Sequence, residues 1–410
     1  MRLSGREFFR TLSVSEALES FRPARRTGTE RVPLVDALGR TPAVPVVSGQ
    51  PLPGFARSTV DGYAVRAQDT YGAGEGLPTY LDVIGAVSMG TAPEVALRPG
   101  TAVQMPTGGA IPPEADAVVM VEYTSLTMPG TVEVTRPVAI GDGIVRADED
   151  VAPGGQLAPA GRPLRAQDLG LLSAAGVCEV EVRARPRVAI VSTGDEVVPP
   201  STRELAPGKV RDATASALAA LVTQAGGVPW YAGIVPDDAE VLTKTLEEAL
   251  AEADLLVVSA GSSVGARDET AAAVERLGRP GIFCHGLAIK PGKPTLLAEC
   301  VDVPVVGLPG NPLSALVVFR MVGLPLLRLV GGITACPPEP TTSATLSRSV
   351  ASSAGRLDVV QVRLDDGVAT PLFGFSALLS ILTAADGYVV IPEADTGLHE
   401  GASVTVTVYR

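Results

Sequence analysis

From Arg187 to Val330 the chain alternates apolar runs of strand length with segments of helix length, and this rhythm limits its possible folds more than any other feature. Strands are expected at 188–191, 230–235, 255–259 and 303–307, and helices at 213–225, 237–251, 269–277 and 313–330. Parallel strands need crossover connections, which helices usually provide. The alternation therefore predicts a parallel α/β sheet, and ligands of such sheets bind beyond the carboxyl ends of the strands.

Outside this region the apolar runs are short and separated by proline and glycine, of which the 410 residues contain 35 and 44. This spacing indicates small β-rich domains joined by tight turns. Helices are expected at 13–26, capped by Ser13, and at 167–175. A chain of this length usually folds around more than one core. We predict a multidomain protein of four parts: a discontinuous elongated domain of residues 1–45 and 150–183, an N-terminal β-domain of 46–149, an α/β domain of 184–335 and a C-terminal β-domain of 336–410.

The composition argues against several classes of partner. The formal net charge is −12, whereas proteins that bind nucleic acid or anionic membrane surfaces are usually basic. Residues 1–10 carry charges and no apolar segment, which is unlike a signal peptide. The most apolar stretch, 313–330, contains Arg320 and Arg328, so we interpret it as a buried helix. We expect a cytoplasmic protein with no nucleic-acid partner and no membrane partner.

Cysteine and histidine are too scarce to support several kinds of active site. The 4 cysteines are scattered, and the chain contains only 2 histidines. A disulfide framework, a zinc site or a Ser-His-Asp triad is therefore not expected. The chemistry must rest on carboxylates, lysines, hydroxyls and backbone N–H groups.

A loop of small residues follows the strand expected at 255–259. Its sequence is SAGSSVG, and it includes Ser262, Ser263 and Gly265. Successive small residues allow backbone N–H groups to point into one concavity, and the start of the next helix adds partial positive charge. The loop suits a phosphate or a small oxyanion, with a simple tight turn as the alternative.

Several carboxylates follow other strands of the same sheet. Glu196 closes the motif STGDE, Asp237 lies after the next strand, and Asp268 follows the Gly/Ser loop. Hard cations such as Mg²⁺ are bound by carboxylate oxygens together with phosphate. The alternative for Asp237 and Asp268 is helix capping, because both lie near expected helix starts.

Two further motifs suit an anion. Lys290 and Lys293 are stiffened by prolines in KPGKP, and the motif GLPGNP opens a helix whose first N–H groups are free. The second motif contains Pro309, Gly310, Asn311 and Pro312. A solvated basic turn and a structural turn are the respective alternatives. Far away in the sequence, Asp61 lies in VDGYAV, where Asp-Gly is a turn signal.

Taken together, STGDE, the loop ending SVG, AIKPGKP, GLPGNP and VDGYAV resemble the molybdopterin molybdenumtransferases, the family of MoeA and the gephyrin E domain. The resemblance covers essentially the whole chain. It implies insertion of molybdate into adenylylated molybdopterin with release of AMP. It also implies an α/β domain similar to the molybdopterin adenylyltransferases, and a homodimer with the site between the α/β domain of one subunit and the N-terminal β-domain of the other. Contact with a molybdopterin adenylyltransferase is a further expectation.

The resemblance also implies roles for individual residues. Catalytic roles fall on Asp61, Asp150, Glu196, Asp237, Asp268, Lys290 and Lys293. Substrate binding falls on Thr107, Gly108, Ser262, Ser263, Gly265, Pro309, Gly310, Asn311 and Pro312. Mg²⁺ is expected on Glu196 and Asp268.

The chain departs from the family pattern at a few positions. Where the family usually has a glycine pair after the strand, this chain has AG at 260–261, followed by Ser262 and Ser263. Residues 211–214 are RDAT where the family usually has Tyr-Asp-Ser/Thr-Asn. Asp148 replaces a glycine, and residues 385–387 are ADG where the family usually has Ala-Asn-Gly. The acids and lysines are intact. The alternatives are a paralogue that inserts tungstate, a phosphoanhydride hydrolase built on the same α/β domain, and a non-catalytic scaffold.

Overall fold

The computed structural model describes residues 11–259 and 264–409, and for 264–268 the backbone alone. One of the three six-stranded sheets in the described part of the chain lies in the α/β domain, with strand order β16-β13-β17-β21-β20-β18. The first four strands are parallel, as predicted: β13 (Arg187–Thr193), β16 (Val228–Val235), β17 (Leu255–Ser259) and β21 (Val303–Leu308). The last two, β20 (Leu296–Cys300) and β18 (Pro280–His285), are antiparallel to their neighbours, so the sheet is mixed.

Helices cover both faces of this sheet. They are α3 (Thr214–Gln224), α4 (Ala239–Leu250), α5 (Val264–Arg276), α6 (Pro312–Val318) and α7 (Leu324–Val330), the last two joined by a π-helical turn at Phe319–Gly323. Val188 and Ile190 of β13 pack in the core with α3, α6 and α7, whereas Ala189 and Val191 pack with α4 and α5. The period-2 alternation of a strand buried on both faces accounts for this division.

The helical stretch Pro312–Val330 confirms the predicted buried helix. Its mean hydropathy of 1.9 and its length would suffice for a membrane span, and it is the one helix of this kind among the described residues. However, 67% of that window is buried inside the protein, where Phe319 and Val322 lie in the main core. It is therefore a core helix of the α/β domain.

The helix predicted at 13–26 is shorter than expected. Helix α1 (Val14–Ser20) begins with a capping box in which the Ser13 hydroxyl accepts from the Glu16 N–H and Glu16 accepts from the Ser13 N–H. It ends at Ser20, because Pro23 disfavours helical backbone at the residue before it. Its buried residues join the α/β core, whereas the predicted grouping placed residues 1–45 with the elongated domain.

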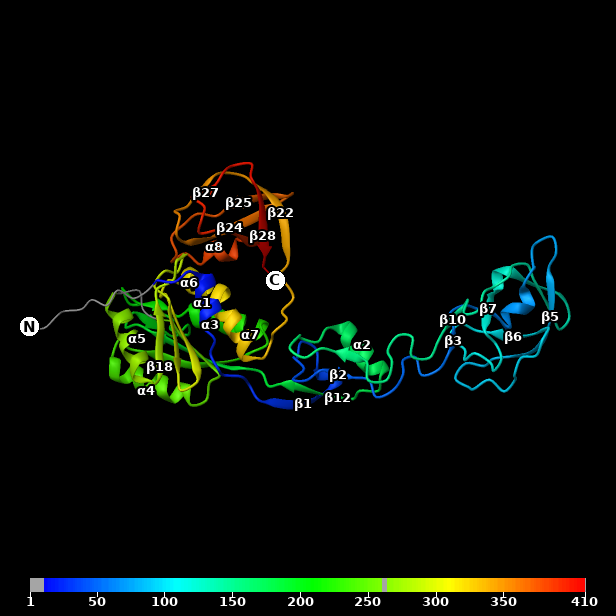
Figure 1. Cartoon of the computed structure of the whole chain (residues 1–410). Coiled ribbons are helices and arrows are strands. Elements are labelled where there is room, and N and C mark those ends of the chain that lie inside the picture. The colour runs from blue at the N-terminus through cyan, green and yellow to red at the C-terminus, as the bar shows by residue number, and fades with distance from the viewer. Residues whose placement is uncertain (1–10, 260–263, 410) are drawn as a thin grey trace, which may run out of the picture.

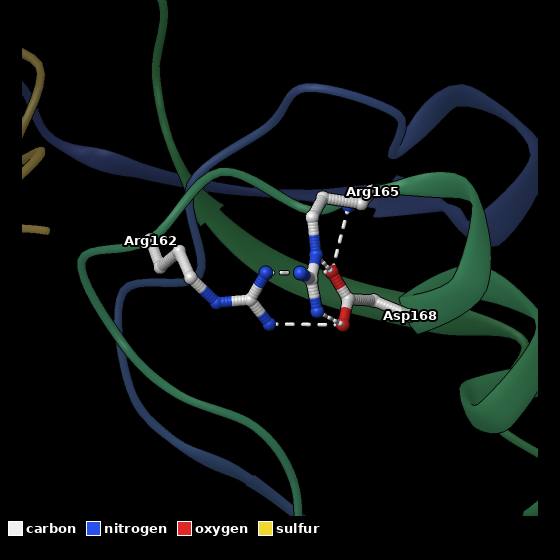
Figure 2. Close-up of polar contacts among 3 residues, drawn as sticks. All are labelled: Arg162, Arg165 and Asp168. Atoms are coloured by element: carbon white, nitrogen blue, oxygen red, sulfur yellow. Dashed lines mark hydrogen bonds and ion pairs between the residues drawn. The ribbon is translucent and has the colours of Figure 1, made fainter. Parts of the chain in front are cut away.

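The elongated middle domain is built from two distant parts of the sequence. Strand β1 (Thr29–Pro33) pairs with β12 (Glu179–Arg183), and β2 (Val46–Val47) pairs with β11 (Gln156–Ala158). Helix α2 (Ala166–Ala174) packs against them. At its start the buried Asp168 carboxylate accepts from Arg162 Nη1 and Nη2, both at 2.9 Å, and from Arg165 Nε at 3.0 Å (Figure 2).

The N-terminal β-domain contains a sheet of order β7-β4-β6-β5-β9-β8. Its strands are β4 (Gly62–Val65), β5 (Thr79–Ala86), β6 (Thr101–Met105), β7 (Ala117–Met120), β8 (Thr124–Met128) and β9 (Thr131–Val134). Gly62 is required by close packing, because a Cβ there would lie 1.9 Å from the carbonyl oxygen of Val119. Next to this sheet, β3 (Arg57–Ser58) pairs with β10 (Ile144–Val145).

The sheet of the C-terminal β-domain has the order β19-β24-β25-β22-β28-β26, and β24 also pairs with β26. Its strands are β22 (Thr341–Leu346), β24 (Leu357–Asp365), β25 (Val368–Pro371), β26 (Gly387–Ile391) and β28 (Ser403–Val408). The short strand β19 (Ile289–Lys290) comes from the α/β part of the chain and pairs in parallel with β24. It therefore connects the predicted lysine motif to the C-terminal sheet.

The arrangement of these parts is elongated. In Figure 1 the α/β domain and the C-terminal β-domain lie together at one end, and the N-terminal β-domain lies at the opposite end. The middle domain, with β1, β2, β12 and α2, separates them. Motifs in the N-terminal β-domain are thus far from the α/β sheet of the same chain.

Candidate functional site

The strand-end loops form a row along one edge of the α/β sheet. Strands β16, β13, β17 and β21 are neighbours in that order and run in parallel, so their carboxyl ends lie side by side. The row consists of Asp237 after β16, Glu196 after β13, and Pro309 after β21. Ser262 and Ser263, which follow β17, lie outside the described residues. The edge is the usual position of a ligand on a parallel sheet.

Carboxylates crowd together at the β13 and β16 end of this row. The Asp237 N–H donates to Asp195 Oδ1 at 3.2 Å, which joins the two loops. The pKa of Asp237 is raised, first by burial and then by the negative charges of Asp195 and Glu196. Gly194, with φ of +136°, permits this packing, because a Cβ there would lie 2.6 Å from Glu196 Oε2. A cation or a proton would relieve the repulsion among these acids.

The capping alternative for Asp237 and Asp268 is wrong. Helix α4 is capped by Asp238, whose Oδ1 accepts from the N–H groups of Glu240 and Val241 at 2.9 and 3.0 Å. Helix α5 begins at Val264, so Asp268 lies in its second turn and Gly265 in its first. The side chain of Asp268 is outside the described part of the structure. Among the side chains that are described, no three Asp, Glu, His or Cys groups are placed to hold a metal ion by themselves.

At the other end of the row, the predicted lysines line a cavity between the α/β domain and the C-terminal β-domain. The cavity has a volume of about 960 Å³, and Lys290, Lys293, Pro309 and Asn311 contribute to its wall. Asn311 Nδ2 donates to Ser376 Oγ at 2.9 Å, which ties the GLPGNP motif to the C-terminal domain. Gly310 lies within that motif, and Pro312 is the first residue of α6.

The loop that carries the two lysines is tightly held. The Lys293 carbonyl accepts from the N–H groups of Leu287 and Thr295, both at 2.9 Å. Gly292 has φ of +126°, and a Cβ there would lie 2.2 Å from Val318 Cγ2 on α6. Glycine is therefore required between the lysines, because any side chain at position 292 would clash with α6.

Two residues of the same cavity were not predicted from the sequence. Arg356 Nε donates to Asp358 Oδ1 at 2.9 Å, and Asp358 Oδ2 lies 3.6 Å from Lys290 Nζ. Both belong to the C-terminal β-domain, whose sheet is not a parallel α/β sheet, so the rule that ligands bind at the carboxyl ends of parallel strands does not apply to them. The only signal was a carboxylate within the apolar run of β24, which needs a partner when it is buried.

The remaining predicted residues lie elsewhere. Asp61 precedes β4, and its Oδ1 accepts from the N–H of Thr107 at 2.7 Å and from the Thr107 hydroxyl at 2.9 Å. These bonds lower the pKa of Asp61, the backbone bond having the larger effect. Gly108, with φ of +84°, continues the same turn. Asp150 lines a cavity of about 450 Å³ with Phe55, next to the junction of the middle domain and the N-terminal β-domain.

The structure thus divides the predicted residues into two groups. The α/β and C-terminal domains bring together one set, namely Glu196, Asp237, Lys290, Lys293, Pro309 and Asn311 at the strand-end row and cavity. The N-terminal β-domain and its junction hold the others, namely Asp61, Thr107, Gly108 and Asp150. Within one chain the two groups lie near opposite ends of the molecule (Figure 1).

The fold and the site define a multidomain protein whose α/β domain presents acids and lysines at one sheet edge, flanked by β-rich domains. Family models match three consecutive parts: "MoeA N-terminal region (domain I and II)" over residues 12–176, "Probable molybdopterin binding domain" over 189–329, and "MoeA C-terminal region (domain IV)" over 343–409. The chain belongs to the MoeA family of molybdopterin molybdenumtransferases. The resemblance inferred from the loop motifs is thereby confirmed.

Individual relatives agree along nearly the whole chain. It is 34% identical over 400 residues to molybdopterin molybdenumtransferase 2 of Mycobacterium tuberculosis, covering 96% of each chain. It is 31% identical over 416 residues to the molybdopterin molybdenumtransferase of Bacillus subtilis, covering 97% of this chain and 94% of that one. The crystal structure of the molybdopterin biosynthesis MoeA protein of Pyrococcus horikoshii OT3 matches with a TM-score of 0.83 at 31% identity, covering 98% of this chain and all of the other.

Proposed function

We propose that this protein inserts molybdate into the dithiolene of adenylylated molybdopterin, with release of AMP. The observation that carries the proposal is the row of acids along one edge of the α/β sheet with the lysine-lined cavity at its end, in a chain that matches named molybdopterin molybdenumtransferases over nearly its full length. Both substrates are anions. A protein of net charge −12 must bind them through local cations and N–H groups.

Molybdate, in this proposal, binds in the cavity between the α/β and C-terminal domains. Lys290 and Lys293 reach it from one tightly held loop, and Arg356 also lines the cavity, where it shares the Asp358 carboxylate with Lys290. Three cations at a partly enclosed site bind a compact dianion more strongly than they would in bulk water. Pro309 and Asn311 line the cavity on the side of the strand ends, and Gly310 and Pro312 belong to the same motif. The pterin and its adenylyl group would bind along the strand ends. Ser262, Ser263 and Gly265 are proposed from their motif in the sequence to bind the phosphates.

The acids at the other end of the row would hold Mg²⁺ together with the phosphates of the substrate. Mg²⁺ is commonly bound by one or two carboxylates plus substrate phosphate, so the crowded Glu196 and Asp237, with Asp268 from α5, fit this arrangement. When bound, the ion would neutralise charge that develops on the adenylyl phosphate as its anhydride is cleaved. The carboxylates themselves would orient the attacking oxygen.

The proposal includes a homodimer in the cytoplasm, in which a second copy completes each site. Asp61, Thr107, Gly108 and Asp150 would then come from the N-terminal β-domain of the partner subunit. The distance between the two groups of residues within one chain supports this arrangement. Contact with a molybdopterin adenylyltransferase, which makes the adenylylated substrate, belongs to the same proposal.

The test is an insertion assay with purified protein, adenylylated molybdopterin, molybdate and Mg²⁺. Glu196→Gln should lower the rate by about 100-fold or more, as expected when one group that stabilises developing charge is removed. Glu240→Gln, an exposed change on the neighbouring α4, is the control and should be neutral. A Glu196→Gln rate close to wild type would rule out the assigned role. The same assay with molybdate and tungstate in competition, read by plasma mass spectrometry of the product, identifies the oxyanion.

A further inference from the structure

A buried carboxylate lies between two cations at the cavity wall. The side chain of Asp358 is only 4% exposed, although it carries a charge. Its Oδ1 accepts from Arg356 Nε at 2.9 Å, and its Oδ2 lies 3.6 Å from Lys290 Nζ. A buried charge is tolerated when it is paired in this way, and removal of the pairing leaves it costly.

The backbone alone does not determine where the two cations point. Strands β19 and β24 pair in parallel with Lys290 directly beside Asp358, and the Leu357 N–H donates to the Ala288 carbonyl at 2.8 Å. This pairing holds the main chain of Lys290 against the C-terminal sheet. The side chains of Lys290 and Arg356 are 56% and 36% exposed, so both have room to turn toward solvent. Asp358 is the group that draws both toward the same wall.

We infer that Asp358 is a positioning residue, which holds Lys290 and Arg356 in the orientation that receives the oxyanion. The inference rests on the proposed function, because it concerns the molybdate site assigned there. It makes the C-terminal β-domain part of that site. Asp358 lies in β24 and Arg356 directly precedes this strand, whereas Lys290 comes from the α/β part of the chain.

The direction in which Asp358→Asn changes the affinity for molybdate distinguishes a positioning role from a purely electrostatic one. Asp358→Asn removes a negative charge next to an anion site, so Coulomb's law alone predicts tighter binding of molybdate. Positioning predicts the opposite, because Arg356 and Lys290 then repel each other and turn away from the cavity. We expect the Kd for molybdate alone, measured by calorimetry on the full chain, to rise about tenfold, which corresponds to about 1.4 kcal/mol. An unchanged or lower Kd overturns the inference.

Further variants exclude a general loss of structure. Asp365→Asn, an exposed change at the far end of β24, is the matched control and should leave the Kd unchanged. Asp358→Glu keeps the charge and should recover most of the lost affinity. In a Lys290→Met background, Asp358→Asn should weaken binding less than it does in the wild type, because one of its two partners is already absent. An equal tenfold loss in that background contradicts the inference. If Asp358→Asn fails to fold, Asp358→Ser, which also removes the charge, is measured against the same expectation.

A measurement without ligand separates this inference from the proposed function. In the Asp358→Asn variant, Lys290 should react faster with an amine-directed reagent than in the wild type, relative to the exposed Lys244 of the same chain. If the wild type binds no molybdate, the molybdate site of the proposed function is wrong, and the reactivity of Lys290 still decides whether Asp358 holds it. Equal reactivity in the two proteins would show that it does not.

Discussion

At the scale of single residues, the pKa of the Asp61 carboxylate is lowered by hydrogen bonds from one neighbour, Thr107. Thr107 donates to it twice, through its N–H and through its hydroxyl, and both bonds favour the charged form. Thr107→Val removes the hydroxyl and keeps the N–H, so the pKa of Asp61 should rise but stay below the ordinary value of 3.8. Carboxyl ¹³C NMR titration measures this directly. Thr91→Val, an exposed change in the same domain, is the control, and an unmoved Asp61 pKa would contradict the assigned hydrogen bond.

Asp237 shows the opposite effect, because like charges surround it. Burial, Asp195 and Glu196 all raise its pKa above 3.8. Glu196→Gln removes one of these charges, so the pKa of Asp237 should fall while burial and Asp195 keep it above the ordinary value. Glu240→Gln serves as the control, since Glu240 is exposed on the first turn of α4. If the pKa of Asp237 stays the same in Glu196→Gln by NMR titration, the two carboxylates do not share one crevice.

The sequence predicted some residues of the candidate site and missed others. Glu196 and Asp237 were accessible, because strand ends in a parallel sheet must share one edge. The lysines were accessible for another reason, because two basic residues stiffened by prolines suit an anion. Arg356 and Asp358 were not, because they reach Lys290 only through the pairing of β19 with β24. The register between a two-residue strand and a distant strand leaves little trace in the pattern.

At the scale of secondary-structure elements, helix α2 depends on one carboxylate. Asp168 accepts from the Arg165 N–H at 2.8 Å and from both guanidinium groups of Arg162 and Arg165, as Figure 2 shows. Asp168→Asn should destabilise the middle domain by about 1–3 kcal/mol, because charge-assisted bonds to a buried group are lost. Hydrogen exchange of the α2 amides measures the loss locally, which suits a chain of several domains. Glu179→Gln on β12 is the exposed control.

The same variant makes a prediction about pH. Arg162 and Arg165 hold the pKa of Asp168 well below its ordinary value of 3.8, the bonds from Arg162 being the largest cause. A lowered pKa gives stability that is present above about pH 4 and is lost as the pH falls through the folded value. The difference in α2 protection between wild type and Asp168→Asn should therefore be full at neutral pH and shrink in acid. A difference that persists unchanged at pH 2 would mean that shape, not charge, is responsible.

Antiparallel strands were the part of the α/β sheet that the sequence did not predict. The hairpin between β20 and β21 turns at Val301 and Asp302, both of which have positive φ. Such two-residue turns are usually marked by Asn-Gly or Asp-Gly, and this one has neither. The parallel strands were recognisable because each is an apolar run that leads into a helix, a pattern that β18 and β20 lack.

At the scale of the whole molecule, the elongated shape keeps the two groups of predicted site residues apart within one chain. The acids and lysines of the α/β edge and the Asp61 turn lie toward opposite ends of one chain, with the middle domain between them (Figure 1). If both groups serve one reaction, they must come from two copies. A two-fold dimer would bring each N-terminal β-domain to the α/β domain of its partner and form two equivalent sites.

Subunit mixing tests this arrangement. An Asp61→Ala subunit and an Asp268→Asn subunit should each be inactive alone. In a shared site, one of the two crevices of the mixed dimer contains neither change, so random exchange should restore about a quarter of wild-type insertion activity by symmetry. A mixture of Glu196→Gln and Asp268→Asn is the control, because both changes lie in the same domain and every crevice then keeps one lesion. Recovery in the first mixture and none in the second is the result expected of a shared site. If both mixtures stay inactive after demonstrated exchange, Asp61 acts within its own subunit or not at all, and the elongated shape needs another explanation.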